Sequence, residues 1–261
     1  MSQAALISEN TEWDQPSANE QKTRVDVAAC YRLMSLYGLT DLTDGFASCR
    51  VEGSKDEFIV GGYGLLPELA RASDLYKRST QGSAKLEKFA GVDIDAFNFT
   101  QAALTSRPEY NACIHAHSEF GVAFSALNCD FLPMTQYGIM FHGKIAYIDF
   151  HDTSVTSEQA RDEIGQALQS GAEILILRNH GFLVPGRSMA QAFFHLYRIE
   201  QACRYQMRAM QTGAEIIIPN KTDLADVRHQ YWTMTHIDND GTREWPSLLA
   251  KLDRLDASYR H

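Results

Sequence analysis

Residues 106–117, with the sequence SRPEYNACIHAH, join the end of one predicted helix to a predicted strand that carries two histidines. The helix ends at Arg107-Pro108, because a proline pushes the residue before it out of the helical region. In the strand, His115 and His117 stand at positions i and i+2. Their side chains therefore point to the same face of the strand and lie about 7 Å apart along it. From there both can reach one metal ion at bonds of about 2 Å.

A third histidine follows the next apolar segment. Residues 173–177 are predicted to form a strand, and His180 comes just after it, before a glycine turn. Three neutral imidazoles on one ion leave coordination positions open for a substrate, which is typical of a catalytic metal site. We therefore predict that His115, His117 and His180 bind one divalent metal ion per subunit. The alternative is that they are core histidines satisfied by hydrogen bonds.

The composition restricts the classes of protein to consider. The chain has 261 residues and 44% of them are hydrophobic, which suits one domain over 21–261 after a polar, flexible tail over 1–20. A formal net charge of −9 argues against nucleic acid or anionic membranes as partners. No apolar run approaches the ~20 residues that span a bilayer. The start lacks the features of a signal peptide, and the five cysteines are scattered, so we expect a cytoplasmic protein.

Hydrophobic periodicity predicts both helices and strands. The helices are expected over residues 22–38, 96–106, 119–127, 157–169, 188–211 and 245–255. The strands are expected over residues 46–51, 58–60, 111–116, 144–150 and 173–177. Because the two kinds of element alternate irregularly, we expect an α/β fold in which helices cover both faces of a mixed, largely antiparallel sheet.

Three runs resemble the class II aldolase/adducin head family: residues 106–117, residues 175–181 (LILRNHG) and residues 244–256 (EWPSLLAKLDRLD). The resemblance covers most of the chain, and the last run is similar to the C-terminal signature of the bacterial adducin-like branch. It implies a three-layer α/β/α fold and a cyclic homotetramer with sites at subunit boundaries. It also implies a divalent metal ion on the three histidines that match those of the aldolases.

The chain departs from the aldolases at the residue that transfers a proton. Their glutamate precedes the helix that ends at Arg-Pro, and counting back from His115 places that position on Ala96. The base is therefore absent, or Asp95 or Asp93 replaces it. The alternative is that these carboxylates are ordinary solvated groups in a surface turn.

Other candidate site residues follow the histidines. Glu119 is a second candidate base, although a glutamate in a first helical turn also stabilises the helix end. Tyr137 roughly matches an aldolase tyrosine that protonates the leaving group, and is equally plausible as a structural tyrosine. Gln136 is a candidate for substrate binding. Arg178 could pair with a substrate carboxylate, or form a structural salt bridge.

The family's phosphate site is also altered. Its Gly-Asn-Ile-Ser-x-Arg segment is GFASCR at residues 45–50, and its Thr-Pro-Ser-Gly-like loop is GGYG at residues 61–64. Phosphate binding needs hydroxyl, amide and backbone N–H groups that converge on the oxygens, so their loss predicts a substrate without a phosphate. We expect an aromatic or apolar part of the substrate near Phe46 and Tyr63. The alternative for Phe46 is a place in the core.

Three histidines without the glutamate suit two chemistries. Fe(II) with three neutral ligands could bind a 2-oxo or 2-hydroxy acid and then O₂. One family branch, in aminocoumarin antibiotic biosynthesis, resembles such an oxygenase and oxidatively decarboxylates an aromatic 2-oxo acid. The lost base and phosphate site narrowly favour this reaction over a Zn-dependent aldolase, epimerase or decarboxylase. A non-catalytic, oligomeric module like the adducin head is the third hypothesis, and the three retained histidines favour an enzyme.

Overall fold

The computed structural model describes residues 16–81, 91–149, 158–233 and 239–261. Its centre is a seven-stranded sheet with the strand order β3-β2-β1-β4-β7-β6-β5. The strands are β1 (Phe46–Arg50), β2 (Glu57–Gly61), β3 (Leu75–Ser79), β4 (Ala112–Ala116), β5 (Ile145–Ile148), β6 (Ile174–Leu177) and β7 (Gly181–Gly186). Neighbouring strands are antiparallel except for the parallel pair β5 and β6, which confirms a mixed, largely antiparallel sheet.

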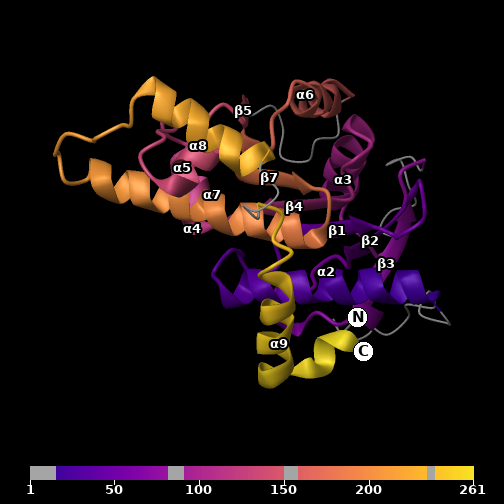
Figure 1. Cartoon of the computed structure of the whole chain (residues 1–261). Coiled ribbons are helices and arrows are strands. Elements are labelled where there is room, and N and C mark those ends of the chain that lie inside the picture. Colours follow the sequence, from indigo (N-terminus) through magenta and orange to yellow (C-terminus); the bar gives the residue numbers. More distant parts are fainter. Residues whose placement is uncertain (1–15, 82–90, 150–157, 234–238) are drawn as a thin grey trace.

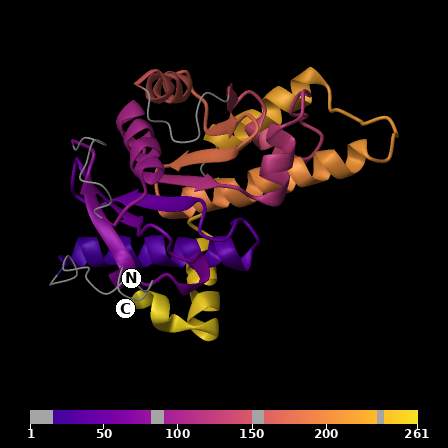
Figure 2. The ribbon, with the colours of Figure 1, turned by 180° about the vertical axis from the view of Figure 1, so that it is seen from behind.

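Helices cover both faces of this sheet, as Figures 1 and 2 show. On one face α2 packs on β1 and β2, and α7 packs on β4 and β7; on the other face α3 and α6 pack on the sheet and on each other. The α-helices are α2 (Ala18–Leu36), α3 (Ile94–Ser106), α4 (Glu119–Ser125), α5 (Gln136–Phe141), α6 (Glu158–Gln169), α7 (Met189–Met210), α8 (Lys221–Thr233) and α9 (Trp245–Leu255). The predicted three-layer α/β/α architecture is confirmed.

Side-chain caps fix where several helices begin. Ser17 accepts a hydrogen bond from the backbone N–H of Glu20, so α2 begins at Ala18, inside the segment expected as a tail. The earlier part of that segment, residues 1–15, lies outside the described residues. Asp93 and Ser188 cap α3 and α7 in the same way. The end of the strand expected over 144–150 and the start of the helix expected at 157 also fall outside the described residues.

Two strands and two α-helices of the described structure were not expected from the sequence. Strand β7 contains Pro185, and a proline argues against a central strand because it donates no hydrogen bond. Strand β3 has the sequence LYKRS and lies at an edge of the sheet, so charged residues interrupt the alternation of apolar and polar residues that usually indicates a strand. Helix α5 is six residues long, and α8 buries no residue, so neither shows a clear apolar face.

No helix among the described residues is long and apolar enough to cross a membrane.

Candidate metal centre

The three predicted ligands meet at the ends of two central strands, because β4 and β7 are antiparallel neighbours. His115 lies in β4 opposite Leu183 of β7. His117 follows the end of β4, and His180 occupies the turn that leads from β6 into the start of β7. The end of one strand and the start of the other therefore carry their histidines to the same place, although the histidines are far apart in the sequence.

The turn that holds His180 depends on Gly181. This glycine has φ +155°, and a Cβ there would collide with the backbone carbonyl oxygen of Ala116. Asn179 adopts a left-handed conformation with φ 58°. Ser125 of α4 fixes the turn from the other side, because its Oγ accepts a hydrogen bond from the N–H of His180 at 3.1 Å. Glycine therefore allows β7 to approach β4 closely enough for the three imidazoles to meet.

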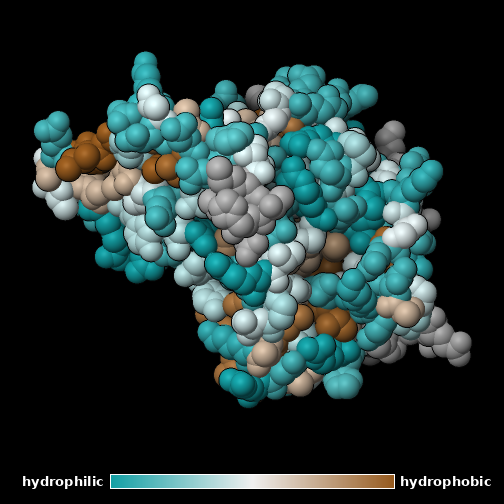
Figure 3. All heavy atoms as spheres, in the orientation of Figure 1, coloured by the Kyte–Doolittle hydropathy of each residue, from teal (hydrophilic) through white to brown (hydrophobic). Residues whose placement is uncertain are grey.

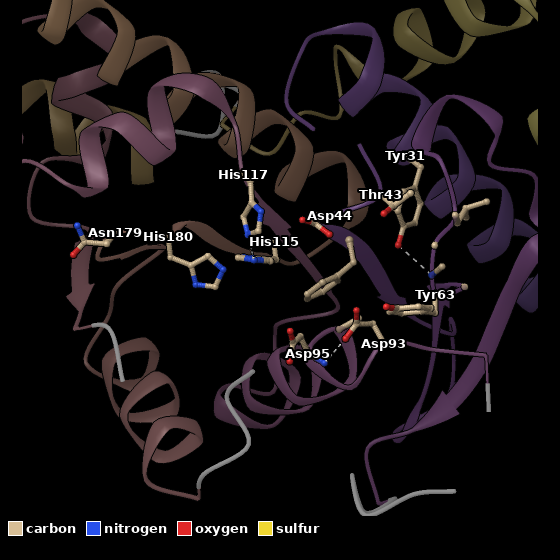
Figure 4. Close-up of a pocket in the computed structure, with 17 residues that line it drawn as sticks. Tyr31, Thr43, Asp44, Tyr63, Asp93, Asp95, His115, His117, Asn179 and His180 are labelled. Carbon is tan, nitrogen blue, oxygen red and sulfur yellow. Dashed lines mark hydrogen bonds between the residues drawn. The ribbon is translucent and has the colours of Figure 1, made fainter. Parts of the chain in front are cut away.

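The imidazole rings form a compact triangle, which Figure 4 shows at the wall of a cavity. The ring centroids are 4.7 Å apart for His115 and His117, and 4.8 Å apart for each of the other two pairs. One potential ligand atom from each ring lies within 4.8 Å of the others. The Nε2 atoms of His115 and His117 are 2.9 Å apart, close to the ~3.3 Å expected for two nitrogens on one tetrahedral zinc ion.

The tautomer of His115 is set by β7. Its Nδ1–H donates to the backbone carbonyl oxygen of Phe182 at 2.9 Å, which leaves the lone pair of Nε2 directed at the other histidines. Phe99 stacks on the same imidazole with ring centroids 4.8 Å apart and holds its plane. The nitrogen that faces the cluster is therefore an acceptor, as a metal ligand must be.

All three histidines are held in the neutral form. Burial, with a contribution from the neighbouring histidines, lowers the pKa of His115 well below its usual value. Burial and the nearby His117 lower the pKa of His180 to about 4. Burial also lowers the pKa of His117, against the opposing effect of Asp44 and Asp41. Three converging neutral nitrogen donors fit a divalent ion such as zinc or iron.

A cavity of about 390 Å³ opens beside the three histidines. Its wall includes Phe46, Tyr63 and the carboxylates of Asp44, Asp93 and Asp95. The described residues that line it include neither lysine nor arginine. The described part of the cavity wall therefore offers no cationic side chain to an anionic group of a ligand, and the absence of a phosphate from the substrate stays a prediction.

The two aromatic residues predicted to contact substrate differ in their surroundings. Phe46 is 4% exposed and packs against Phe99 and His115, with ring centroids 6.2 and 5.8 Å away, so it belongs both to the core and to the cavity wall. Tyr63 is 66% exposed and lies at the cavity in the glycine-rich loop after β2. Tyr63 therefore presents most of its surface to solvent beside the cavity.

The start of α3 brings two of the predicted carboxylates to the cavity. Asp93 caps the helix, because its Oδ1 accepts a hydrogen bond from the N–H of Asp95 at 2.8 Å. Ala96, where the aldolase glutamate would fall, also lines the cavity. Ala96 and its neighbour Asp95 therefore share the cavity wall, and the match of Ala96 to the aldolase glutamate stays a prediction.

The other four predicted site residues are not part of this cavity within one chain. Glu119 and Gln136 are exposed at the starts of α4 and α5. The guanidinium of Arg178 stacks on the ring of Tyr147 at 4.1 Å and donates to the carbonyl oxygen of Leu127 at 2.8 Å. Tyr137 lines a second cavity. Their roles in a reaction stay predictions.

Asp44 is a cavity residue that the sequence reasoning missed. Strand β1 pairs with β4 so that Phe46 lies opposite His115, and continuing this register by two residues places Asp44 opposite His117. A carboxylate oxygen of Asp44 lies within 4.8 Å of a ring nitrogen of His117, and Asp41 joins the same group. Its position could have been found from the sequence only if the pairing of β1 with β4 had been known.

Comparisons with known proteins agree with this geometry. The model of the family described as "Class II Aldolase and Adducin N-terminal domain" matches residues 25–207. The Pseudomonas aeruginosa protein named "Putative aldolase class 2 protein PA3430" is 31% identical over 94% of this chain and 95% of its own length. The crystal structure of an aldolase II superfamily protein from Pseudomonas syringae superposes with a TM-score of 0.85 and 30% identity, over 95% of this chain and 98% of that chain. Beta-adducin from Rattus norvegicus is 30% identical over 93% of this chain, which spans 35% of that protein.

Proposed function

The chain belongs to the class II aldolase and adducin family, and on that premise we propose that it is a metal-dependent lyase acting on a substrate without a phosphate. The proposal rests above all on the convergence of His115, His117 and His180 at the 390 Å³ cavity. The substrate class is a 2-oxo or 2-hydroxy acid, and the bond that breaks is a carbon–carbon bond. The aromatic surface of Phe46 and Tyr63 suits an aromatic or apolar part of that acid.

The carboxylates of the cavity support the lyase reaction over the oxygenase that the sequence narrowly favoured. One of the two arguments against an aldolase was the missing base at Ala96. Asp44, Asp93 and Asp95 all line the same cavity as the three histidines, so a base is available there. The family match and its relatives support the lyase at least as well as the Fe(II)/O₂ reaction.

Each group has a definite task in the proposed reaction. His115, His117 and His180 would hold a divalent ion, which would supply Lewis-acid polarisation of the substrate carbonyl. Asp95 takes the proton that leaves the substrate hydroxyl, since its neighbour Asp93 is engaged in capping α3. The cavity offers no lysine or arginine among its described residues, so the ion held by the three histidines would be the cation that balances a substrate carboxylate.

The family resemblance also leads us to propose a homotetramer with sites at subunit boundaries. Tyr137 lines a cavity other than the one beside the histidines. It could act as the acid for the leaving group only at the site of a neighbouring copy. Light scattering on the purified protein tests the assembly, and a monomeric mass at working concentration contradicts this part of the proposal.

One experiment separates the three hypotheses. Protein purified without air is analysed for bound metals and then incubated with 4-hydroxy-2-oxo acids that carry aromatic or aliphatic substituents. O₂ uptake and the release of 2-oxo acid and aldehyde are followed together. Stoichiometric metal with cleavage and no O₂ uptake is the expected result. Iron with substrate-dependent O₂ consumption would establish the oxygenase instead, and a fully metallated protein that turns over no substrate would favour an adducin-like module.

A further inference from the structure

A second cavity lies where α7 meets the end of α2 and the start of α9. It has a volume of about 210 Å³ and shares no lining residue with the metal cavity. In Figure 3 the surface is hollowed where the projecting arm of α7 and α8 meets the part of the molecule that carries α9. Its aromatic walls are Tyr37, Tyr137, Phe193, Phe194 and Tyr197. Aromatic walls with a few convergent polar groups are typical of small-molecule sites.

One of those polar groups is the guanidinium of Arg198. It packs on the rings of Tyr137 and Phe194, at 4.1 and 4.5 Å from their centroids. It forms no hydrogen bond or ion pair with any residue in the described part of the chain. Stacking occupies the flat surface of a guanidinium and leaves the N–H groups at its edge, which match a carboxylate in a bidentate arrangement. Arg198 is therefore oriented by the aromatic walls and available to an anion.

The other polar group is Glu244 at the start of α9. Its Oε1 accepts hydrogen bonds from Arg243 at 2.6 and 3.1 Å. Its Oε2 is buried and has no hydrogen-bond partner in the described structure, and the side chain does not cap the helix. A buried carboxylate oxygen without a donor is costly, so an O–H or N–H group of a ligand would satisfy it.

Lys251 contacts one wall of the cavity, because its Nζ lies 4.8 Å from the ring of Tyr37 and 3.3 Å from the hydroxyl oxygen of that residue. The volume is below the ~300 Å³ at which sites for drug-sized ligands begin, so the ligand contains a single ring. We propose that this cavity binds a single-ring aromatic carboxylate that also carries a hydroxyl or amino group. Arg198 holds the carboxylate, and Glu244 accepts the hydrogen bond from the second group.

Calorimetric titration of the full-length protein tests this site with three matched probes. The first, 4-hydroxybenzoate, has both groups; benzoate lacks the hydroxyl; and 4-hydroxybenzamide replaces the carboxylate with a neutral amide. We expect 4-hydroxybenzoate to bind most tightly and the amide at least tenfold more weakly, because only an anion uses the guanidinium fully. Equal binding of the acid and the amide, or binding of none of the three, would overturn the proposal.

Two variants assign the binding to the named side chains. Arg198→Met should weaken 4-hydroxybenzoate at least tenfold, while Arg204→Met on the same helix, where the cation lies over Phe120, should leave its affinity unchanged. Glu244→Gln should remove most of the preference for 4-hydroxybenzoate over benzoate. Circular dichroism and the molecular mass confirm that each variant is folded. Equal losses in the two arginine variants would contradict the assignment.

A third variant separates this site from the metal centre. His117→Ala removes a proposed metal ligand and should leave the affinity for 4-hydroxybenzoate unchanged, so this test can fail independently of the proposed lyase. If His117→Ala abolishes binding, the ligand occupies the metal cavity of the same or a neighbouring copy, and the proposal is wrong. If Arg198→Met changes the oligomeric mass and the wild-type protein binds no probe, the cavity is instead a contact between copies of the chain.

Discussion

The Nδ1 atom of His115 lies 2.9 Å from the backbone carbonyl oxygen of Phe182, so the pairing of β4 with β7 decides which nitrogen of His115 faces the cavity. This bond orients the imidazole and fixes its tautomer before any ion arrives. The strand that supplies the carbonyl begins at Gly181, directly after His180. The pairing of β4 with β7 therefore positions His180 and orients the imidazole of His115.

Removal of one histidine should separate metal binding from folding. We expect His117→Ala to weaken metal binding more than ~100-fold, because only two of the three convergent nitrogens remain. Competition with a chelator measures the affinity, and circular dichroism should show an unchanged fold. His142→Ala is the matched control, since His142 lies at the end of α5 and does not line the cavity. An equal loss of affinity in both variants would contradict the predicted ligand set.

Because β7 lies so close to β4, we predict that the fold tolerates substitution of Gly181 poorly. We expect Gly181→Ala to lower the free energy of unfolding by about 2 kcal/mol or more and to reduce metal content, because its Cβ would collide with the carbonyl of Ala116. Gly165 in α6 has no atom within 4 Å of an added Cβ. Gly165→Ala should therefore raise stability by up to about 1 kcal/mol. Urea unfolding of both variants measures the contrast, and a tolerant Gly181→Ala variant would refute it.

The buried histidine of α7 predicts a loss of stability in mild acid. Burial lowers the pKa of His195 to about 4, from an ordinary value of 6.5. Between these values the unfolded chain binds a proton on this side chain and the folded chain does not, so the free energy of unfolding falls as the pH drops below 6.5.

A variant isolates this proton. The Nε2–H of His195 donates to the carbonyl oxygen of Asn239 at 2.9 Å, and a glutamine amide can also donate to that oxygen without titrating. We expect His195→Gln to have a shallower slope of stability against pH, by up to about 1.4 kcal/mol per pH unit between pH 6.5 and 5. Unfolding measured with a chelator present excludes effects of metal binding. Parallel slopes in the two proteins would show that His195 is not the titrating group.

The proposed base predicts a variant that keeps its metal and loses turnover. We expect Asp95→Asn to lower kcat by about 100-fold or more, since general-base catalysis contributes that much, while metal content stays unchanged. Asp93→Asn is the control, because asparagine also caps helices and keeps α3 intact. If Asp44→Asn loses the activity and Asp95→Asn keeps it, the base is the aspartate beside His117.

The surroundings of Arg178 predict an effect on stability rather than on substrate binding. Its guanidinium stacks on Tyr147 and donates to the carbonyl oxygen of Leu127. We expect Arg178→Ala to lower the free energy of unfolding by about 1–3 kcal/mol and to leave KM unchanged. Arg254→Ala in α9 serves as an exposed control. A rise in KM at unchanged stability would restore Arg178 as the residue that binds a substrate carboxylate.

Local patterns were sufficient to predict most elements. The amphipathic pattern of the last predicted helix gave the bounds that α9 has in the structure, Trp245–Leu255. Strand β7 was missed because Pro185 argued against a strand, yet its neighbours in the sheet keep it fully buried. Helix α8 was missed because none of its residues is buried, which leaves no apolar stripe to detect.

The sequence by itself determined the family, the two kinds of element and the three candidate ligands. The spacing of His115 and His117 was sufficient to place both side chains on one side of a strand, because successive side chains of a strand alternate. Only the tertiary structure decided which other residues join them. Asp44 lies beside His117 because β1 pairs with β4. Arg178 instead stacks on Tyr147. Tyr137 lines the second cavity. Such contacts depend on strand order and on the packing of distant segments. Neither is encoded in the periodicity of any single stretch of the chain.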